Sequence, residues 1–113
     1  MVQLDLSNNR LAGTIPESIG HMTFLNFLML QSNLLSGKVP KSVGHMVSAE
    51  EIYLSHNKLE GILPQDIGHL EKLRGLKVDH NMFSGDLPSV WKQKRISEWI
   101  FGFCLFMMCC FCC

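Results

Sequence analysis

The sequence has no excess of charge of either sign and no cysteine before residue 104. Ten Lys and Arg residues balance 10 Asp and Glu residues in a chain of 113. This balance argues against a nucleic-acid partner, which is normally matched by a basic excess or a basic stripe. All 5 cysteines lie within residues 92–113. Because five is an odd number, a complete disulfide framework is excluded.

The chain is also too short for several classes of protein. A length of 113 residues is enough for one domain, so neither a protein-kinase catalytic domain nor a dinucleotide-binding fold with a substrate domain can fit. The sequence has no glycine-rich phosphate loop, and no Ser/His/Asp or Cys/His arrangement stands out. Because 47% of the residues are hydrophobic, intrinsic disorder is excluded as well.

The dominant feature of the sequence is a repeat of 24 residues. Prolines, asparagines and glycines all recur at this interval, and apolar residues keep the same register in further columns, such as Leu4, Leu28, Ile52 and Leu76. Such self-similarity is typical of solenoid proteins, in which each repeat is one structural unit stacked on the next. The repeated positions are Pro16, Pro40, Pro64 and Pro88; Asn9, Asn33, Asn57 and Asn81; and Gly13, Gly37, Gly61 and Gly85.

Each period predicts one coil of a solenoid. Residues 28–30 alternate apolar and variable side chains, which is typical of a short strand with one buried face. The Asn that follows can satisfy backbone groups where the coil turns off the strand, because its amide both donates and accepts. A Gly and a Pro come next, and they bracket residues 17–20 and their copies too closely for a long helix. We therefore predict a loose turn or a short 3-10 segment on the back of each coil.

The period resembles the plant-type leucine-rich repeat, L-x-x-L-x-L-x-x-N-x-L-x-G-x-I-P-x-x-I-G-x-L. The matching runs are LDLSNNRLAGTIPESIGHM, LMLQSNLLSGKVPKSVGHM, IYLSHNKLEGILPQDIGHL and LKVDHNMFSGDLPSVW, which cover about residues 2–91. The Gly-x-[Ile/Val/Leu]-Pro element separates this class from other leucine-rich repeats. The resemblance implies an α/β-type leucine-rich-repeat solenoid of about four coils, with short parallel strands on the concave face and irregular or 3-10 segments on the convex face.

In that family, the repeats form the ectodomains of receptor-like kinases, the ectodomains of receptor-like proteins, and secreted inhibitors of cell-wall-degrading enzymes. The resemblance therefore implies a non-enzymatic module that recognises a protein or a peptide in signalling or defence perception, without a cofactor. Our leading interpretation is part of a receptor-like protein. Two alternatives stay open: an ectodomain fragment of a receptor-like kinase, and an inhibitor of a cell-wall hydrolase.

The beginning of the chain departs from the family pattern. Met1 lies directly before the first strand, whereas such ectodomains usually begin with a signal peptide and a Cys-containing cap. Val2, Leu4, Leu6 and Leu11 would then line an uncovered edge, and we expect a truncated, marginally stable solenoid over residues 1–91. Secreted members commonly carry Asn-x-Ser/Thr sequons, and none occurs here. The resemblance implies a plasma-membrane or extracellular location; compartment and oligomeric state stay open.

Residues beside the strand leucines should point outward on the concave face, where a partner can bind. Phe27, Met29 and Tyr53 would form an exposed apolar cluster on adjacent coils. Aromatic anchors ringed by polar groups are typical of interaction hot spots. The predicted partner-binding residues are Phe27, Met29, Glu51, Tyr53, His56, Lys77 and Asp79, and the predicted structural ladder is Asn9, Asn33, Asn57 and Asn81.

Histidines follow the same register. His21, His45 and His69 form one column, and His56 and His80 form another. Imidazoles on adjacent coils could chelate a metal ion or titrate together. The family usually has a small polar residue such as Asn in the column of His21, and His can make the same hydrogen bonds. We therefore predict no metal site.

Residues 92–113 form a separate segment that is basic at first and then hydrophobic. Lys92, Lys94 and Arg95 precede Trp99 to Cys113, a run of 15 apolar, Gly or Cys residues. A helix of this length spans about 22 Å, against about 30 Å for the hydrocarbon core of a bilayer. We predict a helical tail, with three interpretations open: a membrane-associating segment, a remnant of truncation or of a faulty gene model, and a cap on the last coil. Its cysteines, Cys104, Cys109, Cys110, Cys112 and Cys113, suit acylation or membrane contact better than metal binding.

Overall fold

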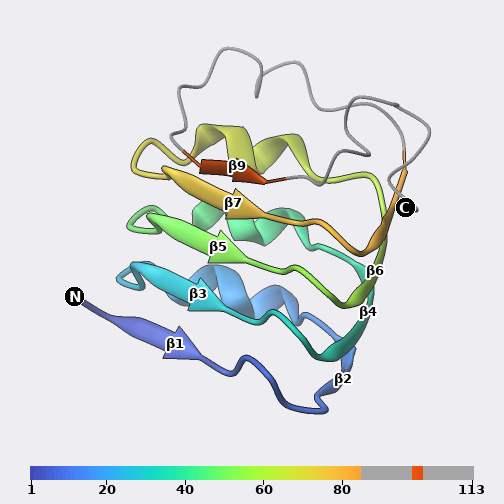
Figure 1. The fold of residues 1–113 in the computed structure, drawn as a ribbon. Helices are drawn as coiled ribbons and strands as arrows, with labels where there is room; N and C mark the ends of the chain where they lie inside the picture. The colour runs from blue at the N-terminus through green and yellow to red at the C-terminus, as the bar shows by residue number, and fades with distance from the viewer. Residues whose placement is uncertain (85–97, 101–113) are drawn as a thin grey trace.

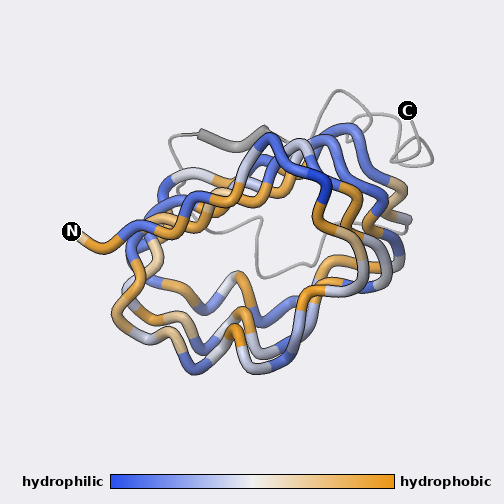
Figure 2. Tube along the Cα trace, turned by 90° about the horizontal axis from the view of Figure 1, so that it is seen from below, coloured by the Kyte–Doolittle hydropathy of each residue, from blue (hydrophilic) through white to orange (hydrophobic). Residues whose placement is uncertain are grey.

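The fold is a stack of coils. The computed structural model describes residues 1–84 and the strand at residues 98–100. The coils lie one above the next, with the N-terminus at one end of the stack (Figure 1). Seen along the stack, successive coils follow nearly the same outline around a common interior (Figure 2). The predicted leucine-rich-repeat solenoid is confirmed.

One parallel sheet runs along the stack, with one strand from each coil. Its strands are β1 (Gln3–Asp5), β3 (Phe27–Met29), β5 (Glu51–Tyr53), β7 (Gly75–Lys77) and β9 (Glu98–Ile100), in that order. Leu4 pairs with Leu28, Leu28 with Ile52, and Ile52 with Leu76. The register from β1 to β7 is thus the 24-residue interval of the sequence.

A second parallel sheet covers another side of the stack, and the sequence analysis did not predict it. Its strands are β2 (Ala12–Thr14), β4 (Leu34–Lys38), β6 (Lys58–Gly61) and β8 (Met82–Phe83), in that order. Gly13, Gly37 and Gly61 lie inside these strands with φ of 91°, 76° and 80°. Such values are rare for residues with a Cβ, so the recurring glycine allows each strand to bend as the coil turns.

Short 3-10 segments form the side of the coil opposite the first sheet. They are η1 (Glu17–His21), η2 (Lys41–His45) and η3 (Gln65–His69), each entered through a Pro in extended conformation. Their glycines let neighbouring segments approach closely: a Cβ at Gly20 would lie 2.5 Å from the backbone oxygen of Ser42. The predicted short 3-10 segments are therefore confirmed.

The interior is filled by the repeated apolar columns. Ile52, Leu59 and Ile67, from the three sides of one coil, are each 0% exposed. Burying a side chain of this size stabilises the fold by about 1.5–3 kcal/mol. A single coil cannot bury these side chains by itself, so its stability depends on the neighbouring coils. At the edge of the first coil, Val2 and Leu6 are 40% and 39% exposed, as expected for an uncovered edge.

The predicted tail begins differently from our expectation. Glu98–Ile100 is the strand β9, which pairs parallel with β7 through Gly75 and Glu98, whereas we predicted a helix there. This pairing extends the first sheet by one strand. The five cysteines and the rest of the tail lie outside the described residues. In the described part of the chain, no helix is long and apolar enough to cross a bilayer.

Candidate partner-binding face

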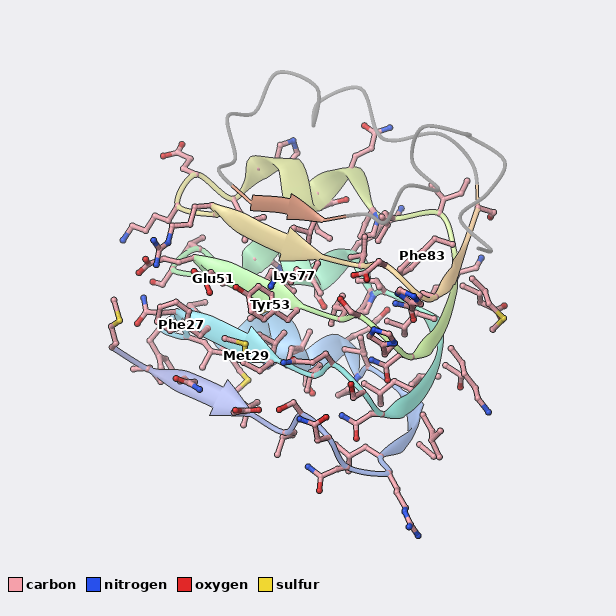
Figure 3. All side chains as sticks on the ribbon, viewed as in Figure 1. Phe27, Met29, Glu51, Tyr53, Lys77 and Phe83 are labelled. Carbon is pink, nitrogen blue, oxygen red and sulfur yellow. The ribbon has the colours of Figure 1, made fainter. Side chains whose placement is uncertain are left out.

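The outward side of the first sheet carries most of the residues that the sequence analysis assigned to partner binding. We define the strand face as Phe27, Met29, Glu51, Tyr53 and Lys77. In the sheet register, Phe27 is the partner of Glu51, Met29 of Tyr53, and Tyr53 of Lys77. The five side chains therefore lie on three neighbouring strands (Figure 3).

A ladder of asparagines fixes the point at which each strand ends. The amide of Asn57 donates from Nδ2 to the backbone oxygens of Leu30, Leu54 and Ser55, at 3.0, 3.1 and 3.2 Å. Its Oδ1 accepts from the backbone N–H of Leu35 at 3.0 Å. Asn33 and Asn81 make the same set of bonds in their coils, and Asn9 makes the two that lie within its own coil. The ends of the strands are consequently held in line along the stack.

The apolar side chains of the strand face are less open than we predicted. Phe27, Met29 and Tyr53 are partly buried and not fully exposed. Parallel strands lie about 4.7–4.9 Å apart, so large side chains in register cover one another's flanks. The outcome is a surface on which these three side chains are each partly covered.

Tyr53 lies at the centre of this surface. Its hydroxyl donates to Oε1 of Glu51 at 2.7 Å, on the same strand. The Nζ atom of Lys77 lies 4.5 Å from the centroid of the Tyr53 ring, in the geometry of a cation–π contact. Arg74 makes ion pairs with Glu50 and Glu51 at 3.5 and 3.3 Å. Acidic and basic groups therefore surround the aromatic ring in fixed positions.

A hollow of about 320 Å³ lies beside Tyr53. It is lined by Gln31, Tyr53, Ser55, His56, Lys77 and Asp79. The Oε1 atom of Gln31 is buried and has no hydrogen-bond partner in the part of the chain that the structure describes. An unpaired buried acceptor is costly.

Asp79 is the acidic group of the hollow. Its Oδ1 accepts from Oγ of Ser55 at 2.6 Å, and its Oδ2 lies 2.9 Å from Nδ1 of His80. Burial raises the pKa of Asp79, but the hydrogen bonds from Ser55 and His80 outweigh burial and hold this pKa below its usual range. The side chain is therefore an oriented carboxylate at neutral pH.

The two histidines of one predicted column meet at the end of the strand face. The rings of His56 and His80 stack with centroids 4.1 Å apart and an interplanar angle of 14°. We did not predict His80 as a site residue; its signal was the 24-residue spacing from His56 combined with Asp79 next to it in the sequence. Among residues 1–84, His56, Asp79 and His80 form the one group of three that could hold a metal ion, so His21, His45 and His69 do not form such a group.

Comparison with known protein families identifies the family of this chain. The leucine-rich repeat family matches residues 1–59, which is more than half of the chain. The chain belongs to the leucine-rich repeat family. A comparison with curated protein sequences found no match.

Solved structures of plant receptor ectodomains are similar to this chain over most of its length. They include the Arabidopsis receptor kinase HAESA in complex with the peptide hormone IDA and the co-receptor SERK1, at 36% identity and a TM-score of 0.81 over 90% of this chain. The ectodomain of the Arabidopsis thaliana membrane receptor kinase GASSHO1/SCHENGEN3, in complex with CASPARIAN STRIP INTEGRITY FACTOR 2, has 42% identity and a TM-score of 0.77 over 80%. The Arabidopsis thaliana BIR2 ectodomain has 33% identity and a TM-score of 0.78 over 82%.

This leucine-rich repeat chain is much shorter than those structures. It spans 17% of the HAESA chain, 11% of the GASSHO1 chain and 49% of the BIR2 chain. The likeness to plant receptor ectodomains confirms the resemblance to the plant extracellular class of leucine-rich repeats.

Proposed function

We propose that this leucine-rich repeat chain is a recognition module that binds a protein or a peptide across its strand face. Its action would be rigid display of side chains and not catalysis. Two of the similar structures are receptor kinases solved with a partner, the peptide hormone IDA in one and CASPARIAN STRIP INTEGRITY FACTOR 2 in the other. These neighbours support a protein or peptide as the partner.

The observation that carries the proposal is the fixed arrangement around Tyr53. Phe27, Met29 and Tyr53 lie on neighbouring strands in register. Glu51 accepts a hydrogen bond from the Tyr53 hydroxyl, and Lys77 lies over the Tyr53 ring. A rigid anchor loses little conformational entropy on binding, so a larger share of its contact energy appears as affinity. Aromatic anchors with a polar rim are the usual composition of binding hot spots.

The polar groups would set the orientation of the partner. Glu51 and Lys77 offer charges of opposite sign on neighbouring strands, so an extended peptide with a basic and an acidic residue in the matching order would fit best. His56 and Asp79 line the hollow next to Tyr53. A partner side chain that enters this hollow would meet the carboxylate of Asp79 and the ammonium of Lys77.

A receptor-kinase origin is the second candidate. The similar structures of HAESA and GASSHO1 are receptor kinases by their names, and this observation favours an ectodomain fragment of a receptor-like kinase over a hydrolase inhibitor. The transcript downstream of the Cys113 codon distinguishes the candidates. An in-frame kinase domain would support the second candidate, and its absence would support a receptor-like protein.

Selection of a random phage-displayed peptide library on the immobilised chain tests the proposal. Peptides that bind the unmodified chain should bind Tyr53→Ala and Phe27→Ala about tenfold or more weakly, because each change removes an anchor. Ile62→Ala is the matched control, since Ile62 is 62% exposed and lies outside the strand face. The circular dichroism of the variants should be unchanged; loss of folding would show that the residues are core.

Two outcomes would contradict the proposal. One is a selected peptide whose affinity is the same for the unmodified chain, Tyr53→Ala and Phe27→Ala. The other is an equal loss of affinity in Ile62→Ala and in the strand-face variants. Either result would place the binding surface elsewhere on the solenoid.

A further inference from the structure

We propose, in contrast to our prediction from the sequence, that His56 and His80, supported by Asp79, form a binding site for a divalent transition-metal ion such as Zn²⁺. The ligand atoms offered by the three residues all lie within 4.8 Å of one another. Imidazole nitrogen is a preferred ligand of Zn²⁺, Cu²⁺ and Ni²⁺, whereas Mg²⁺ and Ca²⁺ prefer oxygen. The two imidazoles therefore favour a transition-metal ion over Mg²⁺ or Ca²⁺.

The backbone brings the two imidazoles together. His56 and His80 occupy the same position in successive coils, and both have left-handed backbones, with φ of 57° and 56°. Each is followed by a buried ladder residue, Asn57 or Asn81. The backbone N–H of His56 also donates to the oxygen of Asp79 at 3.1 Å. The two Cα atoms are thus fixed, and the stacked rings lie 4.1 Å apart.

Asp79 prepares His80 to act as a ligand. Oδ2 of Asp79 lies 2.9 Å from Nδ1 of His80, and the carboxylate can only accept, so Nδ1 is assigned the proton. The lone pair then lies on Nε2 of His80, which is free to bind a metal ion. Carboxylates commonly orient metal-binding histidines in this way. The Ser55 hydroxyl holds Asp79 in turn, at 2.6 Å.

The site is open on one side. The His80 side chain is 57% exposed, and Asp79 is 17% exposed, so the imidazoles can rotate apart to place both nitrogens about 2.0–2.1 Å from one ion. The remaining coordination positions would be filled by water. Lys77 lines the same hollow, but its ammonium lies over the Tyr53 ring. The negative charge of the Asp79 carboxylate offsets the positive charge of Lys77. Metal binding here does not depend on the proposed recognition function.

Calorimetric titration of ZnCl₂ into the full chain, without an affinity tag and with its 5 cysteines alkylated, measures the site. We expect one equivalent of saturable binding. His56→Asn and His80→Asn should abolish it, and Asn suits these variants because it tolerates the left-handed backbone, as at Asn8, whose φ is 56°. Asp79→Asn should weaken binding about 10- to 100-fold. His45→Asn, which changes an exposed His at the end of η2, is the control and should bind as the unmodified chain does.

A second measurement needs no variant. Substoichiometric Ni²⁺ added to the unmodified chain should broaden the NMR signals of His56 and His80 before those of His21, His45 and His69, because the paramagnetic effect falls steeply with distance. Equal broadening of all five, or zinc binding that persists in both His56→Asn and His80→Asn, would overturn the proposal.

Discussion

The ammonium of Lys77 lies 4.5 Å above the ring of Tyr53, from the neighbouring strand. The contact links β5 to β7 on the strand face, in addition to the backbone bonds of the sheet. A cation over an aromatic face contributes about 0.5–1 kcal/mol at an exposed site. Lys77 and Tyr53 should therefore be energetically coupled.

A double-mutant cycle tests this coupling. Tyr53→Leu and Lys77→Met each remove one partner and retain apolar bulk, so the free energy of unfolding of the double variant should exceed the additive value by about 0.5–1 kcal/mol. Urea unfolding of the four proteins gives the coupling. An additive result would show that the contact does not stabilise the fold.

The asparagine ladder predicts that removing one side-chain amide will destabilise the fold. Asn57→Leu would leave the N–H of Leu35 and the backbone oxygens of Leu30 and Leu54 without their bonds to this side chain. The oxygens of Leu30 and Leu54 keep their bonds from Asn33 and Asn81, so the main cost falls on the N–H of Leu35. We expect a loss of about 1–3 kcal/mol in the free energy of unfolding, because a buried donor that loses its partner keeps its desolvation cost. Asn9→Leu is the control: Asn9 is exposed, so its loss should be smaller. Equal melting temperatures for Asn57→Leu and the unmodified chain would refute the prediction.

The close packing of the 3-10 segments predicts whether a Gly→Ala substitution raises or lowers the stability of the fold. Gly→Ala normally stabilises a protein by about 0.4–1 kcal/mol where the backbone permits it. At Gly44, however, the added Cβ would lie 2.5 Å from Cβ of Asp66 and 2.7 Å from its backbone oxygen. We therefore expect Gly44→Ala to lower the melting temperature, with a cost of about 1–3 kcal/mol from overpacking. A raised melting temperature would mean that η2 and η3 are less closely packed.

The shared interior predicts the cost of a cavity. Ile52→Ala should reduce the free energy of unfolding by about 2–5 kcal/mol, since Ile52 is 0% exposed and packs between coils. Ile62→Ala, at a 62% exposed position, should change it by less than about 0.5 kcal/mol. Denaturant unfolding distinguishes the two, and similar values for both variants would argue against a continuous core.

The coils and the first sheet could be predicted because the repeat determines the register. Once Leu4, Leu28, Ile52 and Leu76 are aligned in the sequence, parallel pairing of their strands follows, since each coil must return to the same position. Pro16 and Gly20 similarly delimit a short 3-10 segment. These features depend on backbone chemistry that recurs in every period.

The second sheet could not be predicted from the same pattern. Ala12–Thr14 shows no alternation of apolar and polar residues, and both Ala12–Thr14 and Lys58–Gly61 contain a Gly that normally weakens a strand. Pairing there follows from the stacking of the coils, which brings equivalent turns within hydrogen-bonding distance. The strand β9 was missed for a related reason, because the apolar composition after Lys92 suggested a helix.

Part of the candidate site was accessible from the sequence. The columns place Tyr53 next to Met29 and Lys77, as the structure shows. Exposure was harder to predict, since it depends on how far each side chain leans on its neighbour. The stacking of His56 on His80 was not predicted either, because ring orientation depends on the Asp79 carboxylate and on the left-handed backbone.

The hydrogen bonds between coils have a consequence for how this protein can change. The ladder bonds that cross from one coil to the next join residues 22 or 27 positions apart. Adding or removing one complete period would leave every other such bond intact, whereas a single inserted residue would change the separation of the partners in every bond that spans the insertion. The binding surface can therefore lengthen or shorten by whole turns without disturbing the bonds between the remaining coils.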